Sequence, residues 1–460
     1  MCQAILLFLV LLLSTARCTL GPDYVRPPVP NHPIYRNQGA TGSSIADLAW
    51  WQIFNDPTLV KLIDTALTNN LDLRAAMARI EEARAQLGIA RADLYPGAVY
   101  GVNADHTAQT KLKGSSAATG FANISYIVDL WGQVRRSNEA ALYQLLATEY
   151  AYRTVSIALV AQVADAYFQL RSIDKRLLIS ERTVETRHRS LDIVKTRYEA
   201  GMVSEVDLQQ ARIQLTNAEA SVVSFRLARS QTENAISLLL GGPPISIPRG
   251  RSIDAQALPA EVPAGVPSEL VERRPDVRQA ELLLAAQTAR IGVAEALRFP
   301  SLTLSADLGG SVTNTINTAF ATIGAGLLGP LFDAGRSKQG VAVEIARTKQ
   351  LLAQYKQSIL SAFREVEDAL AAAQLNKDRY EILQRQVEAA QAATNLTWAR
   401  YQEGMTSFLE VLDIERSLFS SELGATDAQA QYITAIVQLY TALGGGWNPK
   451  QTPAAASPIK

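Results

Sequence analysis

The chain contains only two cysteines, Cys2 and Cys18, and both lie in its N-terminal stretch. The apolar run Ile5–Leu13 is too short for a membrane-spanning helix, which needs about 20 residues, but it has the length of the apolar core of an export signal. A single cysteine retained after a signal peptide at 1–17 predicts a bacterial lipoprotein in which the Cys18 thiol is acylated. The alternative is an ordinary secreted protein cleaved nearby, in which Cys18 has no role.

The remaining polar residues do not have the spacing of a catalytic or metal site. His32, His106 and His188 are scattered along the chain, and no nucleophile motif accompanies them. The glycine-rich segments GGPP (241–244) and GGGW (444–447) end helices and do not open them, which disfavours anion binding. We therefore expect no enzyme activity, no cofactor and no metal. The 44 basic and 44 acidic side chains also argue against a nucleic-acid partner.

The two halves of the chain resemble each other. LGIARADLYP (87–96) matches IGVAEALRFP (291–300), and RYEAGMVSEVDL (197–208) matches RYQEGMTSFLEV (400–411). Matches at both ends of each half predict a tandem duplication. The predicted division is a signal peptide at 1–17, an N-terminal extended segment at 18–49, a first repeat at 50–242, a Pro-rich linker at 243–269, a second repeat at 270–447 and a C-terminal tail at 448–460.

Within each half the same elements are expected in the same order. The segment 56–94 has helical periodicity and no proline after Pro57 at its start, so one helix ending before Pro96 is predicted. Two short strands follow. Two proline-free stretches, 131–200 and 335–403, are then each expected to form a helix about 100 Å long at 1.5 Å per residue. Return helices of about 35 residues complete two helical hairpins.

The four predicted strands alternate between apolar and polar side chains. In SLTLSADLG (301–309), leucines and alanine share one face, while serines, Thr303 and Asp307 share the other. Four strands cannot close a membrane barrel, for which about eight is the minimum. If they enter a membrane, several copies of the chain must therefore combine their strands. The alternative is a small soluble sheet that caps a helical bundle.

Each long helix is expected to end in a tight turn at a glycine, Gly201 or Gly404. A few residues later the return helices begin with Ser204-x-x-Asp207 and Ser407-x-x-Glu410. Both are of the capping-box type, and Asp207 fits the pattern less well than Glu410. The sequence thus predicts a mainly α fold with a small β part, built from duplicated hairpins.

Six segments have a characteristic sequence: CTLGPDYVRP (18–27), WWQIFNDPTLVKLIDTAL (50–67), RRPDVRQAE (273–281), ARIGVAEALRFPSLTL (289–304), RYQEGMTSFLEVLDIERSL (400–418) and ALGGGWNP (442–449). In order and over nearly the whole chain after 1–17, these resemble the outer membrane factor family of TolC/OprM-like channels, and its NodT-type efflux lipoproteins most closely. The resemblance implies a homotrimer with a 12-stranded outer-membrane barrel continuous with a 12-helix periplasmic tunnel. It also implies export of drugs or other small molecules together with a periplasmic adaptor protein and an inner-membrane pump of the resistance-nodulation-division type.

The resemblance also assigns roles at the hairpin tips. In this family the periplasmic end closes through side chains just after the second tip, which correspond to Leu409, Asp413 and Arg416 here. Their i, i+4, i+7 spacing puts them on one helix face, although without the resemblance a local pair of solvated charges would be the simpler interpretation. The tips expected to dock the adaptor are Gly201, Met202, Val203, Ser204, Gly404, Met405, Thr406 and Ser407.

Two other functions remain open. A duct of a type I protein secretion system would use the same architecture. A periplasmic coiled-coil scaffold would use the helices without entering the membrane. The resemblance favours the efflux channel, located in the outer membrane in contact with its lipid, with the helical part in the periplasm.

Overall fold

The computed structural model describes residues 19–28, 51, 54–109, 112–256, 267–313 and 316–445. The predicted signal peptide, Cys18 and the C-terminal tail lie outside the described residues. The chain divides into two compact units. Unit 1 takes in residues within Met1–Val29, Met77–Ala151 and Asp276–Ile359, and unit 2 takes in residues within Pro30–Ala76, Tyr152–Pro275 and Leu360–Lys460.

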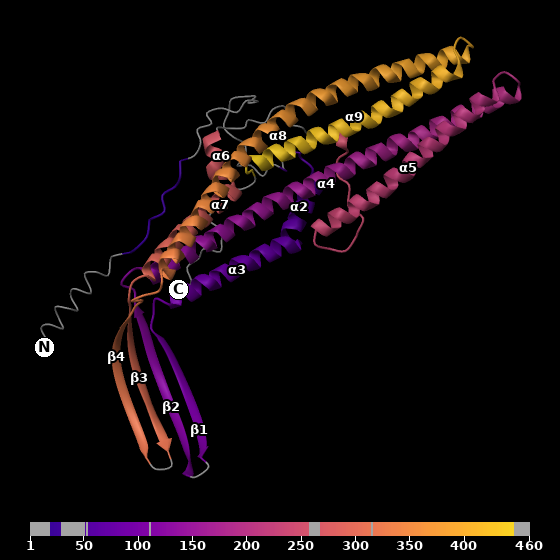
Figure 1. Cartoon of the computed structure of the whole chain (residues 1–460). Coiled ribbons are helices and arrows are strands. Elements are labelled where there is room, and N and C mark those ends of the chain that lie inside the picture. Colours follow the sequence, from indigo (N-terminus) through magenta and orange to yellow (C-terminus); the bar gives the residue numbers. More distant parts are fainter. Residues whose placement is uncertain are drawn as a thin grey trace. The chain divides into compact units, whose positions relative to one another are not determined.

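The two halves contain matching helices of equal length (Figure 1). Helices α3 (Leu71–Ala92) and α7 (Pro275–Ala296) have 22 residues each. The long helices α4 (Gln133–Glu199) and α8 (Arg336–Gln402) have 67 residues each, and the return helices α5 (Glu205–Leu239) and α9 (Phe408–Ala442) have 35 each. These equal lengths agree with a tandem duplication. The remaining helical elements are α2 (Pro57–Asn69), η2 (Ile253–Ala255) and α6 (Pro267–Arg273).

The prediction of one continuous helix over 56–94 is wrong, because the helix is interrupted at Asn70. Asn70 has φ −58° and ψ 132°, outside the helical region. Its side-chain oxygen accepts a hydrogen bond from the backbone N–H of Leu73 (3.0 Å), and its amide group donates to the carbonyl of Leu239 (2.9 Å). An asparagine side chain that bonds the backbone in this way competes with the helix. The apolar periodicity continues on both sides of the break and therefore concealed it.

The sheet of unit 1 consists of four antiparallel strands (Figure 1). They are β1 (Gly97–Gln109), β2 (Leu112–Val128), β3 (Ser301–Thr313) and β4 (Asn317–Leu328), in the order β1-β2-β3-β4. The prediction of two strands per half is confirmed. Because β2 pairs with β3, the two halves of the duplicated chain join in the middle of the sheet, and β1 and β4 are its edges.

The two faces of this sheet differ in polarity. In one row Asn123 lies opposite Asp307, which lies opposite Thr322. The next row, on the other face, places Ile124 opposite Ala306 and Ala306 opposite Ile323. The predicted alternation is therefore confirmed. We call these the polar face and the apolar face.

Each face has a few exceptions to its character. On the apolar face the polar side chains lie near the turns that connect the strands: His106, Ser116 and Asn317. The polar face also carries larger apolar side chains: Val99, Phe121, Ile127, Phe320 and Leu328. Several large side chains on the apolar face are strongly exposed in the single chain, with Tyr100 at 90% and Ile323 at 91%. Exposed apolar area of this extent indicates contact with lipid or another chain.

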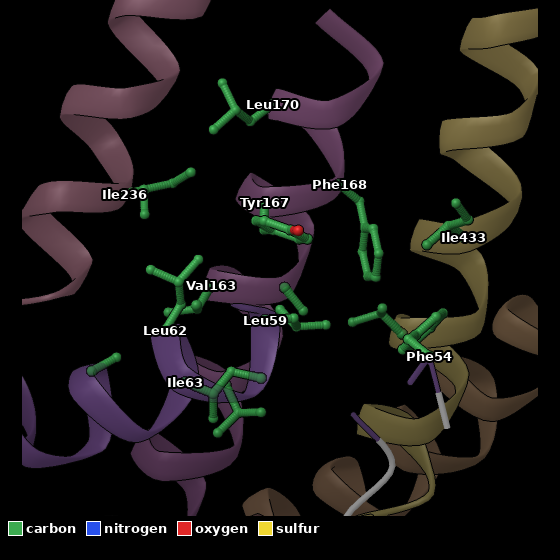
Figure 2. Packing of buried hydrophobic residues seen from close by; sticks show 14 of the residues in the cluster. Phe54, Leu59, Leu62, Ile63, Val163, Tyr167, Phe168, Leu170, Ile236 and Ile433 are labelled. Atoms are coloured by element: carbon green, nitrogen blue, oxygen red, sulfur yellow. The ribbon is translucent and has the colours of Figure 1, made fainter. Parts of the chain in front are cut away.

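Unit 2 has a hydrophobic core formed by α2, α4, α5 and α9 (Figure 2). Aromatic rings fill its centre, and Phe54 and Phe168 lie with ring centroids 4.7 Å apart. Ile63 from α2, Ile236 from α5 and Ile433 from α9 surround them and are fully buried or nearly so. This core holds the bases of the two hairpins together.

Asp56 connects this core to the Pro-rich linker. Its carboxylate caps α2 by accepting hydrogen bonds from the backbone of Thr58 and Leu59, and it accepts a further bond from the Tyr167 hydroxyl at 2.7 Å. The backbone N–H of Arg251 and the side-chain amide of Gln256 also donate to it, at 3.1 and 3.0 Å. Residues 243–252 of the linker contain no helix or strand, η2 follows at Ile253–Ala255, and these hydrogen bonds fix this part of the linker to the core.

Candidate functional site: the paired hairpin tips

Both hairpins reverse direction through the same turn. Gly201 and Gly404 have φ of +71° and +74°, a region that favours glycine. The N–H groups of the following methionines, Met202 and Met405, donate to carbonyls in the last turn of α4 and α8, each at 2.8 Å. This is the hydrogen-bond pattern of a glycine-terminated helix. A tight turn of this kind leaves both methionine side chains exposed to solvent.

The return helices are capped differently from the prediction. Ser204 and Asp207 form the complete reciprocal box, because each side chain accepts from the other residue's backbone N–H. At the second tip the Ser407 hydroxyl accepts from the Glu410 N–H, and only this half of the box is present. The expectation that Asp207 fits less well than Glu410 is therefore wrong. The aspartate side chain is shorter than that of glutamate, and its carboxylate accepts a hydrogen bond from the Ser204 backbone N–H at the start of α5.

The two tips lie side by side at one end of unit 2. The Arg197 guanidinium on α4 stacks over the Tyr401 ring on α8, with 4.4 Å between its central carbon and the ring centroid. It also donates to the carbonyls of Tyr401 and Gln402, each at 3.3 Å, where a cation stabilises the C-terminal end of a helix. A small apolar cluster that includes Val194, Leu208 and Phe408 packs beneath. The sequence predicts each tip but not this contact between them.

Leu409, Asp413 and Arg416 lie on one exposed side of α9, which we call the gate face. Their side chains are all more than half exposed, and Asp413 reaches 84%. An Arg416 Nη atom lies 3.8 Å from an Asp413 carboxylate oxygen, and Arg416 Nε donates to the Leu412 carbonyl at 3.4 Å. An exposed pair at this distance contributes little to stability. These side chains are available to a partner surface or to a lumen.

Glu415 lies on the opposite, buried side of α9. It is 5% exposed and faces Arg187 of α4, which is 4% exposed, with 3.6 Å between Arg187 Nε and Glu415 Oε2. The indole N–H of Trp398 on α8 donates to Glu415 Oε1 at 2.8 Å, and the Ser190 hydroxyl donates to the same oxygen at 3.4 Å. Arg187 also donates to Gln214 of α5 at 2.8 Å. We call these five residues the inner polar cluster.

Burial shifts the pKa values of both charged members of this cluster. It raises the pKa of the Glu415 carboxyl, because the carboxylate has lost water, while Arg187, Trp398 and Ser190 oppose the shift. It lowers the pKa of Arg187, against the attraction of Glu415. The sequence did not predict this cluster. The only available signal was that Glu415, two residues after Asp413, falls on the other side of the helix.

Three further points concern lipidation, metal binding and membrane-spanning helices. Cys18 lies outside the described residues, so its predicted acylation is not tested. Among residues 54–109, 112–256, 267–313 and 316–445, no group of three or more potential metal ligands comes together. No helix in these ranges is long and apolar enough to cross a membrane.

Comparison with known proteins supports a channel. A sequence profile described as "Outer membrane efflux protein" matches residues 62–242 and 266–445. The toluene efflux pump outer membrane protein TtgC of Pseudomonas putida is 35% identical over 453 residues, which cover 94% of this chain and 93% of that protein. The cation efflux system protein CusC of Escherichia coli is 34% identical over 454 residues, which cover 95% of this chain and 97% of that protein.

A solved structure gives the same result for the fold. The open state of the Neisseria gonorrhoeae MtrE outer membrane channel is similar with a TM-score of 0.85 and 31% identity, covering 95% of this chain and 100% of that chain. The similarity thus includes the sheet as well as both hairpins. The resemblance seen in the sequence is confirmed, and the chain belongs to the outer membrane efflux protein family, as the outer-membrane channel of an efflux pump with a periplasmic helical part and no enzymatic role.

Proposed function

We propose that three copies of the chain form the outer-membrane duct of a tripartite efflux system for drugs or other small molecules. The four-stranded sheet carries this proposal, because its edge strands β1 and β4 each have one edge without a partner strand in the described chain. The hydrocarbon region does not tolerate such edges, since no water is present to bond their backbone groups. Pairing β4 of one copy with β1 of the next gives the backbone groups of both edge strands hydrogen-bond partners. Three copies then supply twelve strands.

The polarity of the sheet sets its orientation in this barrel. The apolar face, with Tyr100, Leu308 and Ile323, faces lipid. The polar face, with Asn123, Asp307 and Thr322, faces a water-filled lumen. Alternation of this kind is the sequence pattern of membrane strands.

The helices of unit 2 also support assembly of three copies, because two of them expose apolar side chains that a neighbouring copy can cover. Away from the tips, side-chain contacts link α5 to α4 through Arg226 with Glu181, α4 to α9 through Arg182 with Glu422, and α9 to α8 through Arg379 with Gln431. The outer helices each carry an exposed apolar stripe at seven-residue intervals: Val206, Ile213, Ala220 and Leu227 on α5, and Leu375, Ile382, Ala389 and Leu396 on α8. A seven-residue period is typical of coiled-coil contacts. We infer that α5 of one copy packs against α8 of the next, which gives a 12-helix tunnel.

The paired tips are the docking site that we propose for the periplasmic adaptor protein. Met202 and Met405 expose flexible apolar side chains there, and methionine suits adaptable binding surfaces. The adaptor then connects the duct to an inner-membrane pump of the resistance-nodulation-division type. One relative is named for toluene efflux and another for cation efflux, at 35% and 34% identity, so relatives of similar identity are named for different substrates. These names favour efflux over type I protein secretion.

The gate face closes the duct when no pump is engaged. In three copies, Asp413 forms a ring of carboxylates at the tip, and the exposed Arg416, which lies 3.8 Å from its own Asp413, pairs instead with a neighbouring copy. A constriction of this kind is charged and attracts cations. At the other end of the chain, Cys18 is the proposed acylated first residue of the mature protein. Mass spectrometry of the mature N-terminus tests this, and an unmodified thiol contradicts it.

Deletion of the gene tests the proposed function as a whole. Cells that lack the protein should accumulate a lipophilic dye that wild-type cells export, and re-expression should restore export. The purified protein should have the native mass of three copies. Normal dye export in the deletion strain, with no second outer-membrane channel expressed, or a monomer in the outer-membrane fraction, contradicts the proposal.

A further inference from the structure

The inner polar cluster joins all four hairpin helices directly behind the gate face. Arg187 comes from α4, Gln214 from α5, Trp398 from α8 and Glu415 from α9. Asp413 and Arg416 flank Glu415 in the sequence but lie on the exposed side of α9. The rotation of α9 about its axis therefore decides both which residues reach the lumen and whether Glu415 reaches its partners.

The cluster is satisfied incompletely. Trp398 and Ser190 both donate to Glu415 Oε1, whereas Oε2 has no hydrogen-bond partner in the described part of the chain. Arg187 approaches Oε2 only to 3.6 Å and gives its direct hydrogen bond to Gln214. A buried ion pair with this geometry regains only part of the energy of desolvation. Such a pair stabilises the fold weakly, but separating or removing one partner leaves a buried charge uncompensated, which is strongly unfavourable.

We propose that Arg187 and Glu415 are positioning residues of the gate: their buried pairing, supported by Trp398, fixes the rotation of α9 that presents Asp413 and Arg416 to the lumen. This inference rests on the proposed gate and goes beyond it. The gate face supplies the charges that close the duct. The inner polar cluster sets the closed state by making any other rotation of α9 separate a buried charge from its partner.

The pair on the gate face cannot provide the same restraint. Leu409, Asp413 and Arg416 are exposed to solvent in the single chain, and the Arg416–Asp413 pair is local to α9. A local pair moves with its helix and cannot fix the helix's rotation. Contacts from α9 to other helices can fix this rotation. Glu415 contacts Arg187 of α4 and Trp398 of α8.

Removal of one or both charges tests the proposal, with single-channel conductance of the purified protein in planar bilayers as the readout. Glu415→Gln keeps the size and an acceptor for Trp398 but leaves Arg187 buried without a counter-charge. We expect its conductance at neutral pH to rise roughly threefold, because an unpaired buried charge is strongly unfavourable. Arg187→Gln combined with Glu415→Gln removes the pairing without leaving a buried charge, so its conductance should lie above that of the wild type and below that of Glu415→Gln.

The pH profile separates positioning from a merely structural role. Burial raises the pKa of Glu415, so this carboxyl takes up its proton earlier than an exposed one as the pH falls. The charged group that faces it is Arg187, and Arg416 lies near Arg187. Wild-type conductance should therefore rise on acidification, whereas the Glu415→Gln variant should already be high and change little.

The matched control is Glu185→Gln on α4, which removes a carboxylate that is paired with Arg189 on the exposed surface. It should leave conductance unchanged. Trp398→Phe is the second test variant should Glu415→Gln fail to assemble: it removes only the indole donor and should raise conductance to a smaller extent. Wild-type conductance in both Glu415→Gln and Trp398→Phe overturns the inference, and so does wild-type conductance in a folded double variant. If Asp413→Ala with Arg416→Ala also leaves conductance unchanged, the proposed gate itself is wrong.

Discussion

Asn123 on β2 donates a hydrogen bond of 2.6 Å to Asp307 on β3, across the strand pair that joins the two halves of the chain. Both side chains are partly buried in the single chain and lie on the polar face. A hydrogen bond to a carboxylate is stronger than one between neutral groups. The pair therefore holds a negative charge at a defined place on the wall of the proposed lumen.

Asp307→Asn should lower the preference of the channel for cations. Three copies place three carboxylates around the lumen, and a ring of carboxylates attracts cations. The measurement is the reversal potential in a potassium chloride gradient across a planar bilayer, which should move toward zero. Thr322→Ala, on the same face and in the same row but uncharged, should leave it in place. An unchanged potential in Asp307→Asn would mean that this face does not line the conducting path.

Asp413→Ala combined with Arg416→Ala should raise conductance without harming the fold. The two side chains are exposed and pair at 3.8 Å, so their removal should change the free energy of unfolding by no more than about 0.5 kcal/mol. The result to expect is an intact trimer by native mass spectrometry with larger single-channel currents. An intact trimer with wild-type currents places the constriction elsewhere.

Asp56→Asn should destabilise unit 2 through its network of donors. Asp56 is fully buried, and every hydrogen bond to its carboxylate comes from a donor. The side-chain NH₂ of an asparagine would face such donors and leave them unsatisfied. The free energy of unfolding should therefore fall by about 1–3 kcal/mol for each unsatisfied group. Burial alone would raise the pKa of Asp56, but hydrogen bonds from Gln256, Tyr167 and the α2 backbone outweigh it, and the pKa is lowered.

The sign of the pH effect at Asp56 follows from this lowered pKa. The carboxylate contributes stability above its unfolded-state pKa of about 3.9, and this contribution is lost as the pH falls through the lower folded-state value. Thermal unfolding should show the gap between wild type and Asp56→Asn narrowing below about pH 4. A gap that is constant with pH would show that the charge of Asp56 is not involved.

Asp165 should give the opposite pH dependence. Burial raises its pKa to about 6, a hydrogen bond with Thr434 opposes the shift, and its Oδ1 has no partner in the described ranges. Between its unfolded-state pKa and about 6 the folded state holds a proton that the unfolded state has lost, so stability falls as the pH rises through this range.

Asp165→Asn imitates the protonated side chain and checks this directly. The variant should be more stable than the wild type above pH 6, by about 1.4 kcal/mol for each unit of pKa shift, and equal to it near pH 4. Melting temperatures across this range are the measurement. Equal melting temperatures at every pH contradict the assignment.

Hydrophobic periodicity and helix-ending residues predict most of this fold, because both depend only on residues that are close together in the sequence. Gly201 and Gly404 mark the tips, since a left-handed turn needs glycine wherever the helices lie. The break at Asn70 has a local part, the bond from the Leu73 N–H, but its second bond goes to the carbonyl of Leu239, which is distant in sequence and which no local pattern indicates. For the same reason the burial of Glu415 beneath the gate face, against Arg187 and Trp398, depends on the packing of helices and not on any motif.

Neighbouring residues on β4 test the central claim, that copies of this chain form a duct lined by the polar face of the sheet. Thr322 lies on the polar face and Ile323 on the apolar face. A charged thiol reagent added during planar-bilayer recording should reduce the current through a Thr322→Cys channel and leave an Ile323→Cys channel and the wild type unaffected. Block of Ile323→Cys with no effect on Thr322→Cys, or no conducting channel from folded protein, would contradict the account.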